Sequence, residues 1–244
     1  MILLIDIGNT NTVCALYDNN TYIKSKRIEQ IENIHTTFEI FLNYDIKFIS
    51  ICSVVPNSTN IYINKIKKIF KIDPFIVSHK NSNITLKVDE PNEVGADRIC
   101  NIKAAIKKIE GACIVIDFGT ATTYDIINKR KEFIGGAIAP GIDVSANYLI
   151  KKAALLKETI LEFPKEIIGK NTKTNIQSGV MYGAIYSIEG MIKHIISELE
   201  ENTTIILTGG FSSLISPKLS IKHILDSTLT LDGIRIIHEE NHEE

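Results

Sequence analysis

The chain has 244 residues, of which 44% are hydrophobic and 23% charged, and its formal net charge is −2. This composition predicts one large globular domain or two smaller ones, and it excludes a disordered or strongly basic chain. Basic residues form only short clusters, such as Lys65, Lys67 and Lys68, which are typical of solvated helix faces. We therefore expect neither a nucleic acid nor a membrane as a partner.

The first residues predict a strand rather than a targeting signal. Met1–Ile5 is apolar, but Asp6 follows at once and no basic region precedes the segment. No apolar run approaches the ~18 residues that a membrane helix needs. The cysteines are scattered without C-x-x-C spacing and are expected to be reduced and buried: Cys14, Cys52, Cys100 and Cys113. Together these features predict a cytoplasmic protein.

The first half of the chain alternates strand and helix patterns. Strands are predicted at Ile2–Ile5, Val13–Tyr17, Tyr22–Ile28, Phe48–Val54 and Phe75–Val77, and helices at Ile31–Asn43, Ile61–Phe70 and Val94–Ile109. In the last of these helices, isoleucines recur every three or four residues and form one apolar stripe. This alternation is typical of an α/β domain.

The second half repeats the opening of the first. Strands are predicted at Cys113–Ile116, Tyr124–Ile127, Glu132–Ala139 and Thr204–Leu207, helices at Asp143–Lys157 and Gly179–Glu200, and a frayed acidic tail after His238. In both halves the first strand leads into an Asp, an apolar residue, a Gly and small polar residues that end in Thr. The near-repeat predicts a duplicated α/β domain, with one copy in residues 1–110 and the other in residues 111–244.

The repeated turn, at Asp6–Thr12 and Asp117–Thr123, has the composition of a phosphate-binding loop. A Gly after the strand allows close approach of the backbone, and N–H groups with Asn and Thr side chains can hold phosphate oxygens. The aspartate is anionic like the phosphate, so it suits a Mg²⁺ that bridges phosphates instead. One copy alone would be better explained as an ordinary hairpin, whereas two matched copies favour nucleotide binding. Neither a P-loop nor a Rossmann motif is present.

The segment Asp89–Arg98 carries a second group of candidate residues. Pro91 and Asn92 suit a helix start, which places Asp97 and Arg98 in or near the first turn. Free N–H groups in a first turn favour anions. Two interpretations are open: the two side chains form a surface ion pair of little energetic value, or Asp97 is a general base beside an anion-binding arginine.

Two glycine-rich segments complete the candidate regions. Gly135–Gly141 is typical of a bend in which the backbone closely approaches another group. Leu207–Ser213 has a Gly-Gly pair directly after a strand. Such a pair is either a simple tight turn or a means of making room for a flat adenine ring, and the local sequence does not choose.

The sequence resembles the type III pantothenate kinases, in the superfamily of acetate and sugar kinases, actin and the heat-shock chaperone ATPases. The resemblance covers nearly the whole chain and rests on the order and spacing of these segments: Asp6–Thr12, Gly95–Arg98, Asp117–Thr123, Gly135–Gly141, Ile168–Thr172 and Thr208–Gly210. It implies two RNase H-like domains of the actin-like ATPase type, with ATP in the cleft between them. It also implies transfer of the ATP γ-phosphate to pantothenate, which gives 4'-phosphopantothenate in the first step of coenzyme A biosynthesis.

The resemblance further implies which residues contact ATP and the metal ions. ATP contacts are expected from Asp6, Ile7, Gly8, Asn9, Thr10, Asn11, Thr12, Val13 and Thr120. Asp6 would also lie beside the Mg²⁺ that accompanies ATP. Asp117 would ligate a monovalent cation, either potassium or ammonium.

The resemblance assigns the substrate to the other motifs. Pantothenate would be bound by Gly95, Ala96, Asp97 and Arg98, and Asp97 would accept the proton of its hydroxyl. Thr172 would contact pantothenate from the partner subunit of a homodimer, so that the substrate site is completed across the interface. Val88 departs from the pattern, because relatives often carry a tyrosine or another polar contact there.

Two other functions are compatible with parts of the sequence. One is a phosphotransferase of the same superfamily that acts on a sugar or a carboxylic acid, against which Gly95–Arg98 with Thr172 favours pantothenate. The other is an ATP-binding regulator of transcription without enzyme activity. The presence of the candidate base and of both phosphate turns, and the lack of a basic DNA-binding face, argue against it.

Overall fold

The computed structural model describes residues 1–29, 34–153 and 159–242, and the chain divides into two compact units. The first unit comprises Met1–Lys108 together with Thr228–Glu244, and the second comprises Ile109–Ser227. We describe each unit by itself. None of the described helices is long and apolar enough to span a membrane.

The first unit is a five-stranded mixed sheet with helices on both faces. The strand order is β3-β2-β1-β4-β5, in which β1 pairs antiparallel with β2 and parallel with β4. The strands are β1 (Ile2–Ile7), β2 (Thr12–Asp18), β3 (Thr21–Ile28), β4 (Phe48–Ser53) and β5 (Phe75–Ile76). The helices are α1 (Ile34–Glu39), α2 (Pro56–Phe70), α3 (Ala96–Lys108) and α7 (Leu229–His242), with a 3-10 turn at Pro91–Glu93.

Alternation along β1 builds two cores, one on each face of this sheet. Leu3, Ile5 and Ile7 pack with residues of α1 and α2. Ile2 and Leu4 point the other way and pack with residues of α3 and α7. Because successive side chains of a strand point to opposite faces, the even-numbered Asp6 lies on the α3–α7 side.

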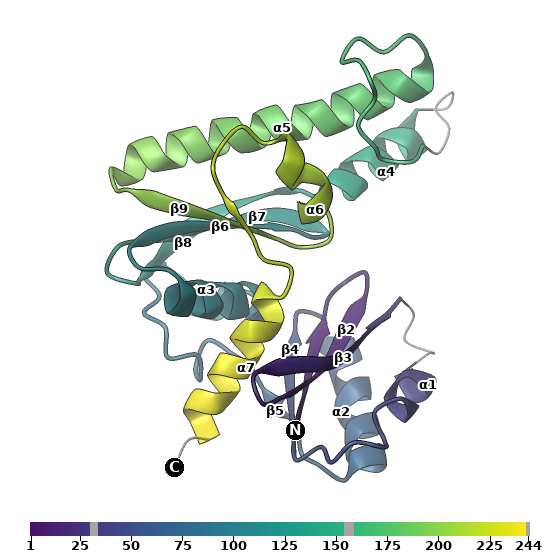
Figure 1. Cartoon of the computed structure of the whole chain (residues 1–244), viewed down its shortest axis with the longest axis vertical. Helices are drawn as coiled ribbons and strands as arrows, with labels where there is room; N and C mark the ends of the chain where they lie inside the picture. The colour runs from purple at the N-terminus through teal and green to yellow at the C-terminus, as the bar shows by residue number, and fades with distance from the viewer. Residues whose placement is uncertain (30–33, 154–158, 243–244) are drawn as a thin grey trace. The chain divides into compact units, whose positions relative to one another are not determined.

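The second unit repeats this plan. Its strand order is β10-β9-β6-β7-β8, with β6 antiparallel to β7 and parallel to β9. The strands are β6 (Ala112–Phe118), β7 (Ala121–Ile127), β8 (Phe133–Pro140), β9 (Thr203–Thr208) and β10 (Ile224–Leu225). The helices are α4 (Ile142–Lys152), α5 (Thr172–Leu199) and α6 (Ser212–Ile215), with a 3-10 turn at Ser216–Lys218. Figure 1 shows α5, the longest of these helices, lying along one face of the second sheet.

The two sheets confirm the predicted α/β class and its duplication. In each unit the first strand is central, the next two strands form an antiparallel meander beside it, and a later strand adds in parallel on its other side. Two antiparallel neighbours follow from short turns, whereas the parallel neighbour requires a helical crossover. The near-repeat in the sequence therefore encodes the same sheet twice.

Helix α5 begins at Thr172, well before the predicted start at Gly179. The cause is a capping box: the N–H of Thr174 donates to Oδ1 of Asn171 (2.9 Å), and the N–H of Asn171 donates to Oγ1 of Thr174 (3.2 Å). Helix α2 likewise begins at Pro56 rather than Ile61, because proline suits the first helical turn.

Two predicted helices reach beyond the described residues. Of the helix predicted at residues 31–43, residues 31–33 lie outside the described part of the chain, and α1 covers Ile34–Glu39. Of the helix predicted at residues 143–157, residues 154–157 lie outside it, and α4 ends at Lys152.

The C-terminal segment differs most from the prediction. Residues 228–244 were expected in the second domain and frayed after His238, whereas they form part of the first unit and α7 continues to His242. Ile234 and Ile237 of α7 are fully buried in the core with α3. Near its end, Nδ2 of Asn241 donates to the carbonyl oxygen of Asn81 (2.8 Å), which anchors the last turn.

Candidate active site

The first candidate phosphate-binding turn, within Asp6–Thr12, joins β1 to β2. The N–H of Gly8 donates to the carbonyl oxygen of Asn11 (3.0 Å) and closes the turn. Asn9 and Thr10 are exposed, while Asp6 is half-buried at the end of the strand. A Cβ on Gly8 would lie 3.1 Å from the Asn11 oxygen, so a side chain there would press on the closing bond. The turn therefore presents polar groups to solvent beside a carboxylate.

The second candidate phosphate-binding turn, between β6 and β7, is shorter but presents the same pattern. The N–H of Gly119 donates to the carbonyl oxygen of Ala121 (3.0 Å). Gly119 and Thr120 are exposed, and Asp117 is half-buried at the end of β6. The two copies of the motif thus place their aspartates and exposed polar residues alike.

Both glycine-rich segments converge on the second turn. The N–H of Gly141 donates to the carbonyl oxygen of Thr120 (3.1 Å), and a Cβ on Gly141 would lie 2.5 Å from the Gly119 oxygen. Gly209 has a φ of +87°, and a Cβ there would lie 2.5 Å from the nitrogen of Phe118. Close backbone contact explains these two glycines. Space for adenine beside them stays a prediction.

Asp97 lies in the first turn of α3. The carbonyl oxygen of Gly95 accepts from the N–H of Ile99 (3.0 Å), so Gly95 is the N-cap residue directly before α3. Oδ1 of Asp97 accepts from the N–H of Arg98 (2.7 Å). A Cβ on Gly95 would lie 2.6 Å from that same Oδ1, so only glycine leaves the carboxylate its place.

The surroundings of Asp97 suit a proton acceptor. Burial raises its pKa above the ordinary value, while the N–H and the guanidinium of Arg98 act in the opposite direction. Both side chains are half-buried. The carboxylate is thus neither a fully solvated surface charge nor a sealed core residue, and this favours the general-base interpretation over the surface ion pair.

The first unit brings Asp6 and Asp97 to the same region. Cys52 lies opposite Asp6 in the β1–β4 register, and Cys100 lies one helical turn after Asp97. The pKa of Cys52 is raised by its hydrogen bond to Cys100, by burial, and by the charges of both carboxylates. The charges of both aspartates therefore raise the pKa values of one buried pair of thiols, Cys52 and Cys100, on the α3–α7 face of the sheet. Local sequence patterns do not reveal this pairing, because the two cysteines lie far apart along the chain.

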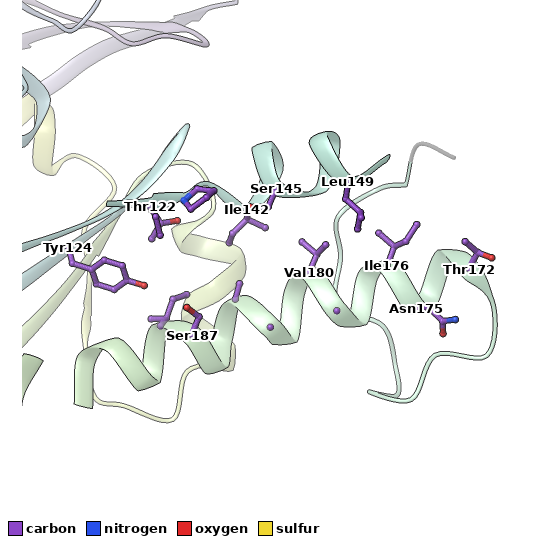
Figure 2. A pocket seen from close by; sticks show the side chains of 16 residues that line it. Thr122, Tyr124, Ile142, Ser145, Leu149, Thr172, Asn175, Ile176, Val180 and Ser187 are labelled. Carbon is purple, nitrogen blue, oxygen red and sulfur yellow. The ribbon is translucent and has the colours of Figure 1, made fainter. Parts of the chain in front are cut away.

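A groove of about 680 Å³ lies in the second unit, lined by residues of α4, α5 and the ends of β7 and β8. Figure 2 shows Thr172 and Asn175 at one end of the groove, and Tyr124 and Ser187 at the other. Tyr124 belongs to the core that packs against α5, so the groove opens on that face of the second sheet. Asp117 points to the opposite face, because Ile116 and Phe118 occupy the α5 face. Within the unit, Thr172 and Asp117 are therefore not brought together.

Among the described residues, no group of three or more His, Cys, Asp and Glu side chains could hold a metal ion together. A metal here would instead be held by a single carboxylate with neutral oxygens or with the phosphates of a nucleotide.

Two solved structures share this fold across the whole chain. A Sinorhizobium meliloti protein, provisionally named a 2-dehydro-3-deoxygalactonokinase, has a TM-score of 0.61 with 11% identity and covers 100% of this chain and 98% of its own. A Campylobacter jejuni protein, provisionally named a Baf family transcriptional activator, has a TM-score of 0.60 with 20% identity and covers 98% of both chains. At such identities the likeness shows the fold alone, and the two-domain α/β architecture is confirmed.

Sequence comparison identifies the family. A model of the type III pantothenate kinases matches residues 2–194. A type III pantothenate kinase from Geobacter sp. (strain M21) is 39% identical over 253 residues, and the match covers 99% of this chain and 100% of the relative. This chain therefore belongs to the type III pantothenate kinase family.

Proposed function

We propose that this protein transfers the γ-phosphate of ATP to the hydroxyl of pantothenate, with Asp97 as the general base. Membership of the family supports the reaction over the whole chain. The structural observation that carries the residue assignment is the placement of Asp97. It lies half-buried at the start of α3, and its charge, like that of Asp6, raises the pKa of the buried Cys52 thiol. The product, 4'-phosphopantothenate, would enter coenzyme A biosynthesis.

The chemistry asked of Asp97 is proton acceptance. Its carboxylate would orient the pantothenate hydroxyl and take the proton as the oxygen attacks the γ-phosphorus in line, while the bond from that phosphorus to the bridging oxygen breaks and ADP leaves. A raised pKa makes the carboxylate a better acceptor near neutral pH. Arg98 would hold the substrate carboxylate through its guanidinium donors, and the backbone of Gly95 and Ala96 would line the same site.

The two phosphate turns would hold the nucleotide. Residues Asp6–Val13 and Thr120 would supply N–H, amide and hydroxyl groups of the kind that bind phosphate oxygens, and Asn9, Thr10 and Thr120 among them are exposed. The half-buried carboxylate of Asp6 fits Mg²⁺, which when bound offsets the charge of the transferring phosphoryl group. Asp117 would ligate potassium or ammonium, which supplies a further positive charge at the second turn.

We propose a homodimer built on the groove between α4 and α5. Tyr148 and Leu149 of α4 are 62% and 45% exposed, which is unusual for side chains of this size. A Cβ on Gly179 or Gly183 would meet no atom within 4 Å, so the partner's backbone could approach α5 closely there. Thr172 lines the same groove and would complete the partner's pantothenate site.

We also propose that the enzyme acts in the cytoplasm. Its reaction consumes ATP, which that compartment supplies. The cysteines of the chain are free and buried, as expected for a protein of a reducing environment: Cys14, Cys52, Cys100 and Cys113.

An ADP-release assay with Mg²⁺ and potassium tests the reaction. We expect turnover that depends on added pantothenate, and 4'-phosphopantothenate as the product by mass spectrometry. A panel of sugars and short carboxylic acids serves as the control for acceptor choice. Turnover with one of these, but not with pantothenate, would assign a different acceptor. Tight ATP binding without turnover on any acceptor would instead support the alternative function, an ATP-binding regulator of transcription without enzyme activity.

A further inference from the structure

The aspartates of the two phosphate turns have different neighbours across their sheets. In the first unit, Asp6 lies opposite Val13 on β2 and Cys52 on β4. Neither of these two side chains contains an oxygen atom. The corresponding positions of the second unit hold threonines, so the repeat is not symmetric in its chemistry.

In the second unit, Asp117 lies between two hydroxyl side chains. Its register partners are Thr123 on β7 and Thr208 on β9. Directly paired residues project from the same face of a sheet, with Cβ atoms about 5 Å apart. The residues adjacent to this row along each strand face the core with α5 instead: Ile116, Phe118, Tyr124 and Leu207. Thr123, Asp117 and Thr208 therefore form one row of oxygen-bearing side chains on the opposite face.

The hydroxyl of Thr123 has no hydrogen-bond partner in the described structure, although its oxygen is buried. A buried hydroxyl left without a partner destabilises the folded state. Such an atom beside a carboxylate is explained when a bound group uses it. Because the hydroxyl oxygen has lone pairs and is neutral, a cation is a suitable group.

The backbone of Gly209 packs against the carboxylate of Asp117. A Cβ on Gly209 would overlap Oδ1 of Asp117, so the carboxylate rests directly against the glycine backbone. The positive φ of Gly209 holds that backbone in a conformation that other residues rarely adopt. The carboxylate is thus confined beside the unpartnered hydroxyl rather than free to turn away.

We propose that Thr123 is a ligand of the monovalent cation beside Asp117, with the Thr208 hydroxyl as the next oxygen in the row. The inference rests on the proposed cation role of Asp117 and extends it to residues with no assigned part. Potassium binds where several protein oxygens replace its hydration shell, and neutral hydroxyls add ligands without adding charge. The register partners of Asp6, Val13 and Cys52, carry no hydroxyl, and its carboxylate suits Mg²⁺, which keeps most of its waters.

Direct cation binding tests this proposal without relying on activity. Thallium(I), which replaces potassium, is titrated into the full-length protein with Mg²⁺ and a non-hydrolysable ATP analogue, and binding is followed by ²⁰⁵Tl NMR. We expect Thr123→Val to weaken thallium binding by about tenfold or more, because the loss of a group that supports a bound metal typically lowers metal affinity by at least that factor. Thr123→Ser keeps the hydroxyl and should bind as the wild type does.

Thr122→Val is the matched control, because it is the same substitution on the same strand but on the opposite face, where Thr122 lines the groove. Equal thallium affinity in Thr123→Val and Thr122→Val would overturn the proposal, and so would a wild-type protein that binds no thallium. Thallium binding that depends on Thr123, in a protein that does not phosphorylate pantothenate, would keep the cation site and refute the proposed reaction instead.

Discussion

The thiols of Cys52 and Cys100 share a hydrogen bond, and this contact between two fully buried side chains ties β4 to α3. The other side of Cys100 is equally confined, because a Cβ on Gly233 of α7 would lie 2.6 Å from the Cα of Cys100. Helix α3, which begins at the candidate base Asp97, is therefore fixed by contacts on two sides. The position of the base is a property of the whole first unit rather than of its own loop.

Gly233→Ala should destabilise the protein. The added methyl group would meet the backbone of Cys100, which cannot move aside as a side chain can, and such overpacking costs about 1–3 kcal/mol. Urea unfolding of the purified variant measures the loss. Gly190→Ala is the matched control, because a Cβ there meets nothing within 4 Å and alanine favours the helix. Equal stability of the two variants would contradict the close contact between α7 and α3.

Asp97→Asn should fold normally and lose activity by a factor of about 10² to 10⁴, because the amide cannot accept the hydroxyl proton. Burial penalises the ionised carboxylate, so the neutral variant should unfold at no lower temperature at pH 7. Kinetics and thermal unfolding check both points, with the exposed Asp73→Asn as the control. Wild-type turnover in a folded Asp97→Asn protein would remove the base assignment.

The acid limb of the pH–rate profile should lie above the ordinary carboxyl range. The base must be ionised, so activity falls as the pH drops through the raised pKa of Asp97. The charge of Arg98 lowers that pKa, so Arg98→Met should move the limb of kcat to higher pH, whereas Arg98→Lys should move it little. A limb that stays in place in Arg98→Met would show that another group titrates.

The local pattern of the sequence predicts nine of the ten described strands, all but the two-residue β10, and the turns that follow β1 and β6, because alternation and glycine placement are short-range signals. It does not predict α7, whose acidic residues resemble a solvated tail. In the structure Glu240 pairs with Lys107 (2.8 Å) and with Lys103 on α3, and these partners are more than a hundred positions away. Local spacing cannot reveal such contacts.

The same distinction holds for the candidate site. Asp97 and Asp117 could be named from their motifs, since each stands beside a glycine or a helix start. The particular importance of Thr123 and Thr208 could not, although both lie in motifs that the sequence singled out. Their relation to Asp117 depends on which residues face each other across β6, β7 and β9, and that register is a property of the folded sheet.

Lowering the pH should reduce the folding stability of the protein through the protonation of His238. The ring of this histidine is buried beside Phe48 and Phe75 and stacks on His242, and burial lowers its pKa to about 4. Between about pH 6.5 and 4 the unfolded chain binds a proton that the folded chain does not, so stability falls as the pH falls. His238→Phe should flatten this dependence, even though Ser50 loses its 2.9 Å hydrogen bond. Urea midpoints from pH 7 to 4 measure it, and an unchanged slope would assign the effect elsewhere.

Gly183→Arg should separate the proposed dimer and weaken pantothenate binding together. The open space above Gly183 would be filled by a long charged side chain, which blocks close approach of a second helix. Because Thr172 is proposed to act in the partner's site, the KM for pantothenate should rise while ATP affinity stays the same. Light scattering after size exclusion gives the oligomeric state, and Gly190→Arg on the same helix is the control. A monomeric Gly183→Arg protein with an unchanged pantothenate KM would show that each subunit builds its substrate site alone.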